Sequence, residues 1–320
     1  MKIAVVGCGR WGTFIAWYLD KKGYNVTLLG RETSSRYQAL VRSRENEYVK
    51  LPESLALSSD FYSEMKNADI IVISIGAQNL REFLSSVDGT ILNNKIFVLS
   101  MKGIEADTGK RLSVVATECG VNKNNLAVWV GPGHIQEFVA NRPNCMVIDS
   151  KNEDLTKKLV GYFGSDLIRF YYGDDLIGNE VGAAAKNVFG ICAGILDGAG
   201  LSTLKGALMA RGAREVSRLI KAMGGNELSA YGLCHLGDYE TTLFSKYSNN
   251  RNYGEALVLK QPFTKLAEGV MTASALKKLG EEYNVDLPIV NAVCSILFED
   301  NEPIAALNSL FSRSSTKEFN

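Results

Sequence analysis

The sequence predicts an α/β chain in which a doubly wound sheet is followed by an all-helical domain. Short runs rich in β-branched residues alternate with helical patterns through the first half of the chain. These runs are continuously apolar, as in parallel strands that are covered on both faces. From about Gly178 the strand pattern fades and longer helical periodicities replace it. We therefore expect a sheet domain over residues 1–178 and a helical domain over residues 179–320.

The individual elements follow from the same patterns in chain order. Six apolar runs predict strands over residues 2–6, 25–29, 70–75, 96–99, 126–130 and 145–148. Helical patterns lie between several of these runs, for example over residues 12–22 and 79–87. In the second half, apolar residues recur at helical spacing over residues 181–196, 205–223, 271–283 and 288–298.

The composition excludes several classes of partner. Thirty-five lysines and arginines balance thirty-five aspartates and glutamates, so no net charge draws the protein to nucleic acid or to an anionic membrane. The apolar runs are far shorter than the ~20 residues that cross a bilayer, and the chain begins with a strand pattern instead of a signal peptide. We expect a cytoplasmic protein with a small-molecule partner, no nucleic acid and no membrane insertion.

The cysteines indicate neither disulfides nor a metal site. Six of them are scattered along the chain without a CxxC pair. None has metal-like spacing to His134 or His235. We expect buried free thiols and no bound metal.

A glycine pattern follows the first expected strand. Gly7, Gly9 and Gly12 form GxGxxG around Arg10 and Trp11, at the start of a helix. The first glycine permits a tight turn, the second lets a pyrophosphate approach the backbone, and the third lets the helix pack closely. A glycine-rich turn without a ligand is the alternative, but the position between strand and helix favours a Rossmann-type dinucleotide site.

The end of the second expected strand bears on the choice of cofactor. An NAD-preferring site usually offers a carboxylate to the ribose diol here. In this chain Arg31 stands near that position, and Ser34, Ser35 and Arg36 offer further donors for a 2′-phosphate. We expect NADP or NAD as cofactor, with NADPH favoured. Glu32 keeps NADH open, and a solvated loop is the alternative for this segment.

One lysine lies in an unusual helical segment, GAAAKNVFG. At ~100° per residue, Lys186 falls away from the apolar stripe, on a face of mostly small residues. A charged amine is costly to bury without a partner. The pattern alone leaves two readings: a lysine that extends past small neighbours into solvent, or one that faces a cleft or another helix.

Many motifs in one order make the chain resemble the NAD(P)-dependent glycerol-3-phosphate dehydrogenases. The likeness extends to about Arg313, and its motifs are MKGIE, GPGHIQE, GNEVGAAAKN, DGAG with ALMARG, GLCHLGDYETT, SNNRNYG, AEGVMTA and LPIVNAV. The resemblance implies a Rossmann domain followed by a helical domain, with hydride transferred between a nicotinamide and a small ketone.

The resemblance also implies roles for individual residues. Lys186 corresponds to the family lysine that donates the proton during ketone reduction. The implied catalytic residues are Lys186, Lys102, Asp238 and Asn187. The implied substrate-binding residues are Lys102, Gly131, Gly133, Thr242, Ser248, Asn249 and Asn250. The implied cofactor-binding residues are Gly7, Gly9, Arg10, Trp11, Gly12, Arg31, Lys102, Ile135, Arg251 and Glu268. A homodimer through the helical half is a further family expectation, and a turn-forming role is the alternative for Asp238.

The chain departs from the family pattern at three places near the expected substrate. Gly133 stands where the family has a serine, with Ile135 in place of an alanine beyond it, and Asn249 stands where the family has a phosphate-binding arginine. The segment after DGAG is one residue shorter. An arginine holds a phosphate with charge-assisted bonds that an amide cannot replace, so we expect weaker phosphate binding. Arg251 offers a substitute guanidinium. His134 is either a new substrate contact or merely an exposed histidine of the loop.

Three functions are compatible with these observations. The first is reduction of dihydroxyacetone phosphate to sn-glycerol 3-phosphate by NADPH or NADH. The second is the same chemistry on a related ketone without the phosphate, such as dihydroxyacetone. The third is a nucleotide-binding protein without turnover, which the joint presence of Lys102, Lys186, Asn187 and Asp238 argues against.

Overall fold

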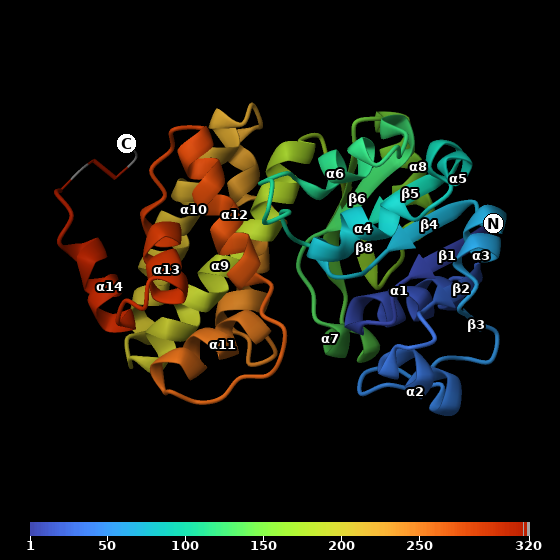
Figure 1. Cartoon of the computed structure of the whole chain (residues 1–320), viewed down its shortest axis with the longest axis horizontal. Coiled ribbons are helices and arrows are strands. Elements are labelled where there is room, and N and C mark those ends of the chain that lie inside the picture. Colours follow the sequence, from blue (N-terminus) through green and yellow to red (C-terminus); the bar gives the residue numbers. More distant parts are fainter. Residues whose placement is uncertain (316, 319–320) are drawn as a thin grey trace. The chain divides into compact units, whose positions relative to one another are not determined.

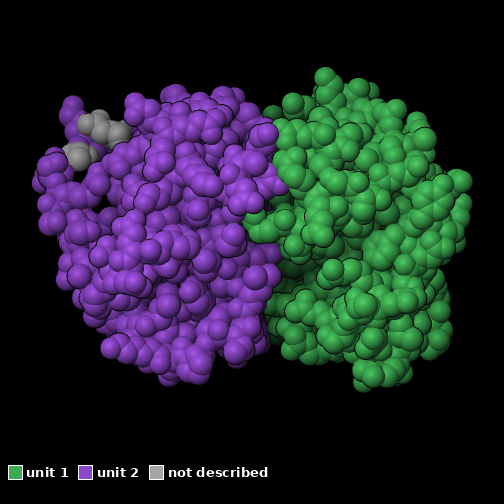
Figure 2. Space-filling view, viewed as in Figure 1, with its two compact units in different colours: residues 1–101, 112–174 green, residues 102–111, 175–320 purple. Residues whose placement is uncertain are grey.

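The computed structural model describes residues 1–315 and 317–318, which form two compact units (Figure 2). The first unit comprises Met1–Met101 and Leu112–Asp174. The second comprises Lys102–Arg111 and Asp175–Asn320. The first unit therefore ends at Asp174, a few residues before the domain boundary expected at residue 178. The short segment from Lys102 belongs with the helical half, although it follows a strand of the sheet.

The first unit is built on an eight-stranded sheet in the order β3-β2-β1-β4-β5-β6-β7-β8 (Figure 1). Its strands are β1 (Lys2–Val6), β2 (Asn25–Leu29), β3 (Ala56–Ser58), β4 (Ile70–Ile73), β5 (Ile96–Leu99), β6 (Leu126–Val130), β7 (Asn144–Ser150) and β8 (Ile168–Tyr172). All pairs are parallel except β6 with β7. The strand order reverses between β1 and β4, and in doubly wound sheets ligands bind at this switch point.

The predicted doubly wound fold and its six predicted strands are confirmed. Four have the predicted limits, β4 ends earlier at Ile73, and β7 is longer at both ends. Two strands were not predicted, β3 and β8, and both lie at edges of the sheet. Their partial exposure removes the continuous apolar run that marks a central strand.

Helices flank this sheet, as the sequence patterns predict. They are α1 (Arg10–Lys21), α2 (Ser35–Ser43), α3 (Phe61–Asn67), α4 (Leu80–Ser85), α5 (Gly89–Asn94), α6 (Leu112–Glu118), α7 (Ile135–Val139) and α8 (Glu153–Phe163). Four of these, α2, α3, α5 and α8, begin at a side-chain cap, such as Asp60 for α3 and Asn152 for α8. Helix α1 does not: it starts at Gly9 without a side-chain cap, so its first backbone N–H groups face outward for another acceptor.

The second unit is a helical bundle around α9 (Leu176–Gly198) (Figure 1). Helix α9 packs against α10 (Lys205–Ala222), α11 (Asn249–Val258), α12 (Gly269–Glu282) and α13 (Pro288–Phe298), and α14 (Pro303–Phe311) packs on α13. The small residues of α9 explain its closest contact. A Cβ on Gly194 would lie 1.9 Å from the Arg251 carbonyl oxygen, and one on Gly254 would lie 2.0 Å from that of Ile191. The backbones of α9 and α11 therefore touch.

The structure also describes the features on which the membrane, cysteine and metal expectations depend. No helix in the described part of the chain combines the length and hydrophobicity needed to span a membrane. The six cysteines are free thiols, and three of them, Cys192, Cys234 and Cys294, are buried. Among residues 1–315 and 317–318, no three His, Cys, Asp or Glu side chains are grouped to hold a metal.

Candidate active site

Two lysines meet on one buried carboxylate in the second unit. The Asp238 Oδ2 atom lies 2.9 Å from Lys186 Nζ and 2.7 Å from Lys102 Nζ. Asp238 is fully buried, and Lys186 is only 8% exposed. Extension of Lys186 into solvent, which the sequence left open, is therefore wrong. The lysine lies in the interior and is paired there.

The local fold explains how these three side chains converge. Lys186 projects from the middle of α9, and Asp238 ends a 3₁₀ turn, Leu236–Asp238, in the segment that packs on this helix. A Cβ on Gly190 would lie 2.8 Å from the Thr242 methyl carbon, and one on Gly182 would lie 2.9 Å from the His235 Cβ. Glycine at both positions therefore lets this segment approach α9 closely enough for the ion pair.

Two threonines complete the polar contacts of the pair. Lys186 Nζ donates a hydrogen bond to Thr242 Oγ1 over 2.7 Å. The Thr241 hydroxyl donates to the other carboxylate oxygen of Asp238. Thr242 was predicted at the site. Thr241 was not, because its place depends on the π-helical turn Glu240–Phe244, which puts both threonine hydroxyls at the lysine–aspartate pair.

Burial and charge set the protonation of this cluster. Burial, together with the positive charge of Lys102, lowers the pKa of Lys186 to about 8, although Asp238 opposes the shift. Burial alone would raise the pKa of Asp238, but the two ammonium groups outweigh it and lower that pKa. Burial raises the pKa of Glu268 to about 7 against the charges of Lys186 and Lys102. The cluster therefore holds an amine that titrates close to neutral pH.

A chain of amides lies next to Lys186. Asn250 Nδ2 donates to Asn187 Oδ1 over 3.0 Å, and the Gly269 N–H donates to Asn250 Oδ1 over 2.9 Å. These bonds fix which end of each carboxamide is donor and which is acceptor. Asn187, the residue after Lys186 in α9, thus accepts through its Oδ1 atom and keeps its amide N–H groups as donors.

The N-terminal turn of α11 contains the substitution of the family arginine. Ser248 caps the helix by accepting the Arg251 N–H over 3.3 Å. The neighbouring Asn249 is half-buried, and its Nδ2 donates to the Leu266 carbonyl oxygen over 3.1 Å. Position 249 therefore carries no positive charge, as expected from the asparagine that stands in place of the family arginine.

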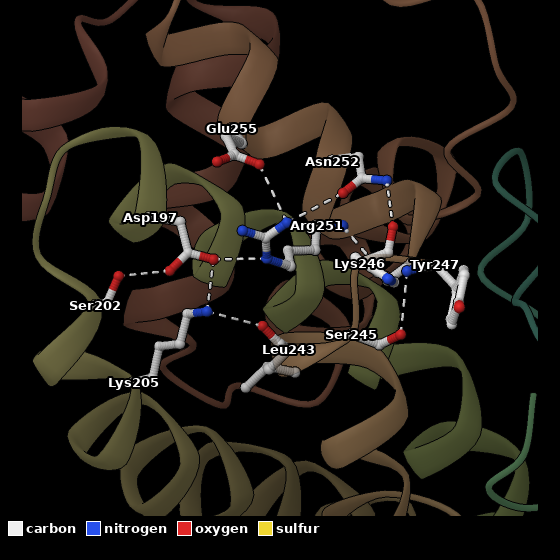
Figure 3. A network of polar contacts seen from close by, with 11 residues as sticks. Asp197, Ser202, Lys205, Leu243, Ser245, Lys246, Tyr247, Arg251, Asn252 and Glu255 are labelled. Atoms are coloured by element: carbon white, nitrogen blue, oxygen red, sulfur yellow. Dashed lines mark hydrogen bonds and ion pairs between the residues drawn. The ribbon is translucent and has the colours of Figure 1, made fainter.

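Arg251 is held in a separate ionic network (Figure 3). Its Nε lies 2.6 Å from Asp197 Oδ2, and its Nη1 lies 3.1 Å from Glu255 Oε2. Asp197 also accepts from Lys205 Nζ at 2.5 Å and from Ser202 Oγ at 2.7 Å. The guanidinium is thus bound to two carboxylates. It is not available in this conformation to replace the missing arginine.

The glycine loop of the first unit has the space that a dinucleotide needs. A Cβ on Gly7 would lie 2.3 Å from the Ser74 carbonyl oxygen, and one on Gly12 would lie 1.9 Å from that of Gly7. A Cβ on Gly9 would instead meet only the Arg36 Nη1 atom, at 3.9 Å, apart from its chain neighbours. The outer two glycines are therefore required by packing, and the middle one borders open space at the uncapped start of α1. These features fit a pyrophosphate.

The GPGHIQE segment is shaped by its own packing. Gly131 and Gly133 have φ values of +129° and +153°, which side-chain-bearing residues rarely adopt. A Cβ on Gly133 would lie 2.4 Å from the Phe138 ring, which packs against Trp11. A serine at this position therefore requires Phe138 to move. Ile135 is buried at the start of α7, next to His134.

The predicted site residues fall into two groups. Gly7, Gly9, Arg10, Trp11, Gly12, Arg31, Gly131, Gly133 and Ile135 belong to the first unit. Lys102, Lys186, Asn187, Asp238, Thr242, Ser248, Asn249, Asn250, Arg251 and Glu268 belong to the second. Within the second group, ion pairs and hydrogen bonds connect Lys102, Lys186 and Asp238 with Thr242, and a hydrogen bond connects Asn187 with Asn250.

Sequence reasoning missed a buried pair behind Asp238. His235 Nδ1 lies 2.9 Å from the Gly182 carbonyl oxygen, and His235 Nε2 lies 2.7 Å from the Tyr239 hydroxyl. Burial lowers the pKa of His235 to about 4, so the ring is neutral at pH 7. It donates from Nδ1 and accepts at Nε2, which fixes the turn that carries Asp238 to α9. The lone histidine inside GLCHLGD was the only available signal.

Comparison with known proteins adds independent information. Family models described as NAD-dependent glycerol-3-phosphate dehydrogenase N-terminus and C-terminus match residues 2–156 and 175–308. A glycerol-3-phosphate dehydrogenase [NAD(P)+] of Prosthecochloris aestuarii is 36% identical over 98% of each chain, and one of Chlorobium phaeobacteroides is 36% identical over 99% of each. The crystal structure of glycerol-3-phosphate dehydrogenase from Coxiella burnetii superposes with a TM-score of 0.89 at 29% identity, covering 98% of this chain and 99% of that one.

Proposed function

Because this chain belongs to the NAD-dependent glycerol-3-phosphate dehydrogenase family, we propose that it reduces dihydroxyacetone phosphate to sn-glycerol 3-phosphate, reversibly, with NADPH or NADH. The observation that carries the proposal is the buried Lys186, paired with Asp238 and titrating near pH 8, in a chain that matches the family along its full length. Full-length relatives that act on the phosphate ester do not favour the alternative of a ketone without phosphate.

Lys186 acts as the proton donor in this proposal. When bound, a dihydronicotinamide would supply the hydride that the carbonyl carbon accepts. The carbonyl oxygen gains negative charge as the C=O double bond becomes single, and an ammonium beside it stabilises that charge. Of the three Lys186 N–H groups, Asp238 and Thr242 accept two, which leaves the third for the substrate oxygen. Transfer of this proton completes the alcohol.

Other residues of the second unit orient the reactants. Lys102 brings a second positive charge to the cluster, where it favours an anionic substrate. Asn187, fixed by Asn250, offers its remaining amide N–H groups to a substrate hydroxyl. The first turn of α11, with Ser248, Asn249 and Asn250, is the proposed place of the substrate phosphate. Because Asn249 is neutral and Arg251 is occupied by carboxylates, the phosphate is held more weakly than by an arginine fork.

Several further expectations accompany this function. We assign dinucleotide binding to the first unit and substrate binding to the second, with Gly131, Gly133 and Ile135 bordering the cofactor and substrate. Arg251 and Glu268 remain proposed neighbours of the cofactor. A cytoplasmic location and a homodimer are proposed from the family likeness, and light scattering on the purified protein tests the dimer.

The proposed substrate is tested by steady-state kinetics. NADPH oxidation is followed by absorbance with dihydroxyacetone phosphate and, separately, with dihydroxyacetone. We expect kcat/KM to be at least ~100-fold higher for the phosphate ester, since a dianion gains charge-assisted bonds that the free ketone lacks. Equal values for the two ketones would refute the proposal. A wild-type rate no faster than that of Lys186→Ala would instead indicate a binding protein.

A further inference from the structure

Two arginines of the first unit lie beside the glycine loop. Arg10 directly follows Gly9 and begins α1. Its guanidinium carbon lies 5.0 Å from the centre of the Tyr48 ring, and its Nε is buried with no hydrogen-bond partner. Arg36 lies in the first turn of α2, and its Nη1 is the atom of another segment closest to the open side of Gly9, 3.9 Å from a Cβ built there.

Arg10 lies over the ring of Tyr48, and the positive charge of Arg36 acts on the same side chain. Burial raises the pKa of the Tyr48 hydroxyl to about 12, a hydrogen bond with Glu47 acts in the same direction, and the positive charges of Arg10 and Arg36 oppose them. Arg10, Arg36 and Tyr48 therefore form one group, the arginine cluster. Within residues 1–315 and 317–318, neither Arg10 nor Arg36 forms an ion pair with a carboxylate. Glu47, an exposed acidic residue next to Tyr48, acts on the Tyr48 hydroxyl.

The acidic side chain that an NADH site requires is engaged elsewhere. Glu32 Oε1, beyond the end of β2, accepts a hydrogen bond from Ser59 Oγ over 2.9 Å. Ser34 is also occupied, because its hydroxyl caps α2 by accepting the Tyr37 N–H. The segment after β2 thus presents a cation, Arg36, to the glycine loop, while its carboxylate is bound to a neighbouring serine.

We propose that Arg10 and Arg36 together bind the 2′-phosphate of NADPH, so that this chain prefers NADPH to NADH. The inference refines the cofactor of the proposed function and rests on it. The segment after the second strand of a doubly wound sheet faces the adenosine ribose, whereas the pyrophosphate is received by the N–H groups at the start of α1. A phosphate monoester carries close to two negative charges, which matches two guanidinium groups without internal counter-ions.

Binding of two nucleotide fragments tests the inference without any turnover. Isothermal titration compares adenosine 2′,5′-bisphosphate with adenosine 5′-monophosphate on the wild-type protein. We expect the bisphosphate to bind at least ~10-fold more tightly. Arg36→Ala and Arg10→Met are each expected to weaken bisphosphate binding by ~10- to 100-fold, the loss of one charge-assisted contact, and to leave the monophosphate unchanged. Methionine at position 10 keeps an apolar stem beside Tyr48.

The matched control is Arg42→Ala. Arg42 is an exposed arginine in the last turn of the same helix as Arg36, so its removal changes the net charge equally. We expect no change in either affinity. Thermal melting of all variants verifies that they fold.

Three results would overturn the inference. They are equal wild-type affinity for both fragments, an equal loss of both in the Arg10 and Arg36 variants, or bisphosphate affinity unchanged in these variants. Failure of the proposed function gives a different result: the fragment preference persists, but dihydroxyacetone phosphate does not stimulate NADPH oxidation.

Discussion

The lysine–aspartate cluster and the arginine cluster handle positive charge in opposite ways. Lys186 and Lys102 share the buried carboxylate of Asp238, whereas Arg10 and Arg36 have no carboxylate partner in the described chain. A cation that must keep one position and an adjusted pKa needs a counter-ion in the protein. A cation that receives an anionic ligand is better left unpaired, because the ligand supplies the opposite charge. The two regions thus separate proton chemistry from ligand selection.

Removing the Lys186 amine is expected to have the largest effect on either cluster. Lys186→Met keeps an unbranched buried side chain but has no proton to donate, and Asp238 retains Lys102 as counter-ion. We expect kcat for ketone reduction to fall by ~100- to 10,000-fold, the usual contribution of a positioned general acid. Stopped-flow absorbance of NADPH measures the rate. The control is Lys157→Met, which removes an exposed lysine of α8. A rate within tenfold of the wild type would contradict the assignment of Lys186.

Removing the carboxylate of Asp238 makes the lysine–aspartate cluster more like the arginine cluster, whose cations have no ion-pair partner in the described chain. Asp238→Asn removes the carboxylate that the Lys186 and Lys102 ammonium groups share, so the pKa of Lys186 should fall further below about 8. Reduction requires the ammonium form, and its rate declines as pH rises through that pKa. We expect this decline near pH 8 in the wild type and at lower pH in Asp238→Asn, with unfolding free energy reduced by about 3–5 kcal/mol. Initial rates at several pH values and denaturant unfolding measure both effects. An unshifted pH profile would show that Asp238 does not set the pKa.

The sequence predicted which residues belong to the site better than it predicted the contacts between them. The small residues around Lys186 indicated a close approach to that face of α9, and Thr242 and Asn250 make this approach at Gly190. The pairing of Arg251 with Asp197 was not foreseen, because it joins side chains 54 positions apart and depends on how the two helices pack. The His235–Tyr239 pair was missed for a related reason: a single buried histidine has no periodic signature. The edge strands β3 and β8 were not predicted, because their exposed positions interrupt the apolar pattern.

Restoring the family arginine should sharpen the phosphate end of the second unit. Asn249 is half-buried at the first position of α11, where the family arginine would stand. We expect Asn249→Arg to lower the KM for dihydroxyacetone phosphate by ~3- to 10-fold, less than a fully buried charge-assisted bond gives, because solvent screens a partly exposed cation. The KM for dihydroxyacetone serves as control and should not change. A parallel decrease for both ketones would show that position 249 does not contact the phosphate.

The smallest expected effect tests how far the arginine cluster extends along the chain. Arg31 follows Gly30 at the end of β2 and is exposed, and it approaches the glycine loop in none of the described contacts, in contrast to Arg36. We expect Arg31→Asp to lower the ratio of kcat/KM for NADPH to that for NADH by several-fold, through repulsion of a 2′-phosphate screened by solvent. Arg31→Ala separates the lost cation from the added carboxylate and should have a smaller effect. If the ratio is unchanged in both variants, Arg31 does not contact the ribose phosphate, and selection falls to Arg10 and Arg36. A change larger than that of Arg36→Ala would instead assign Arg31 the principal contact, and the open space beside Gly9 would need a different occupant.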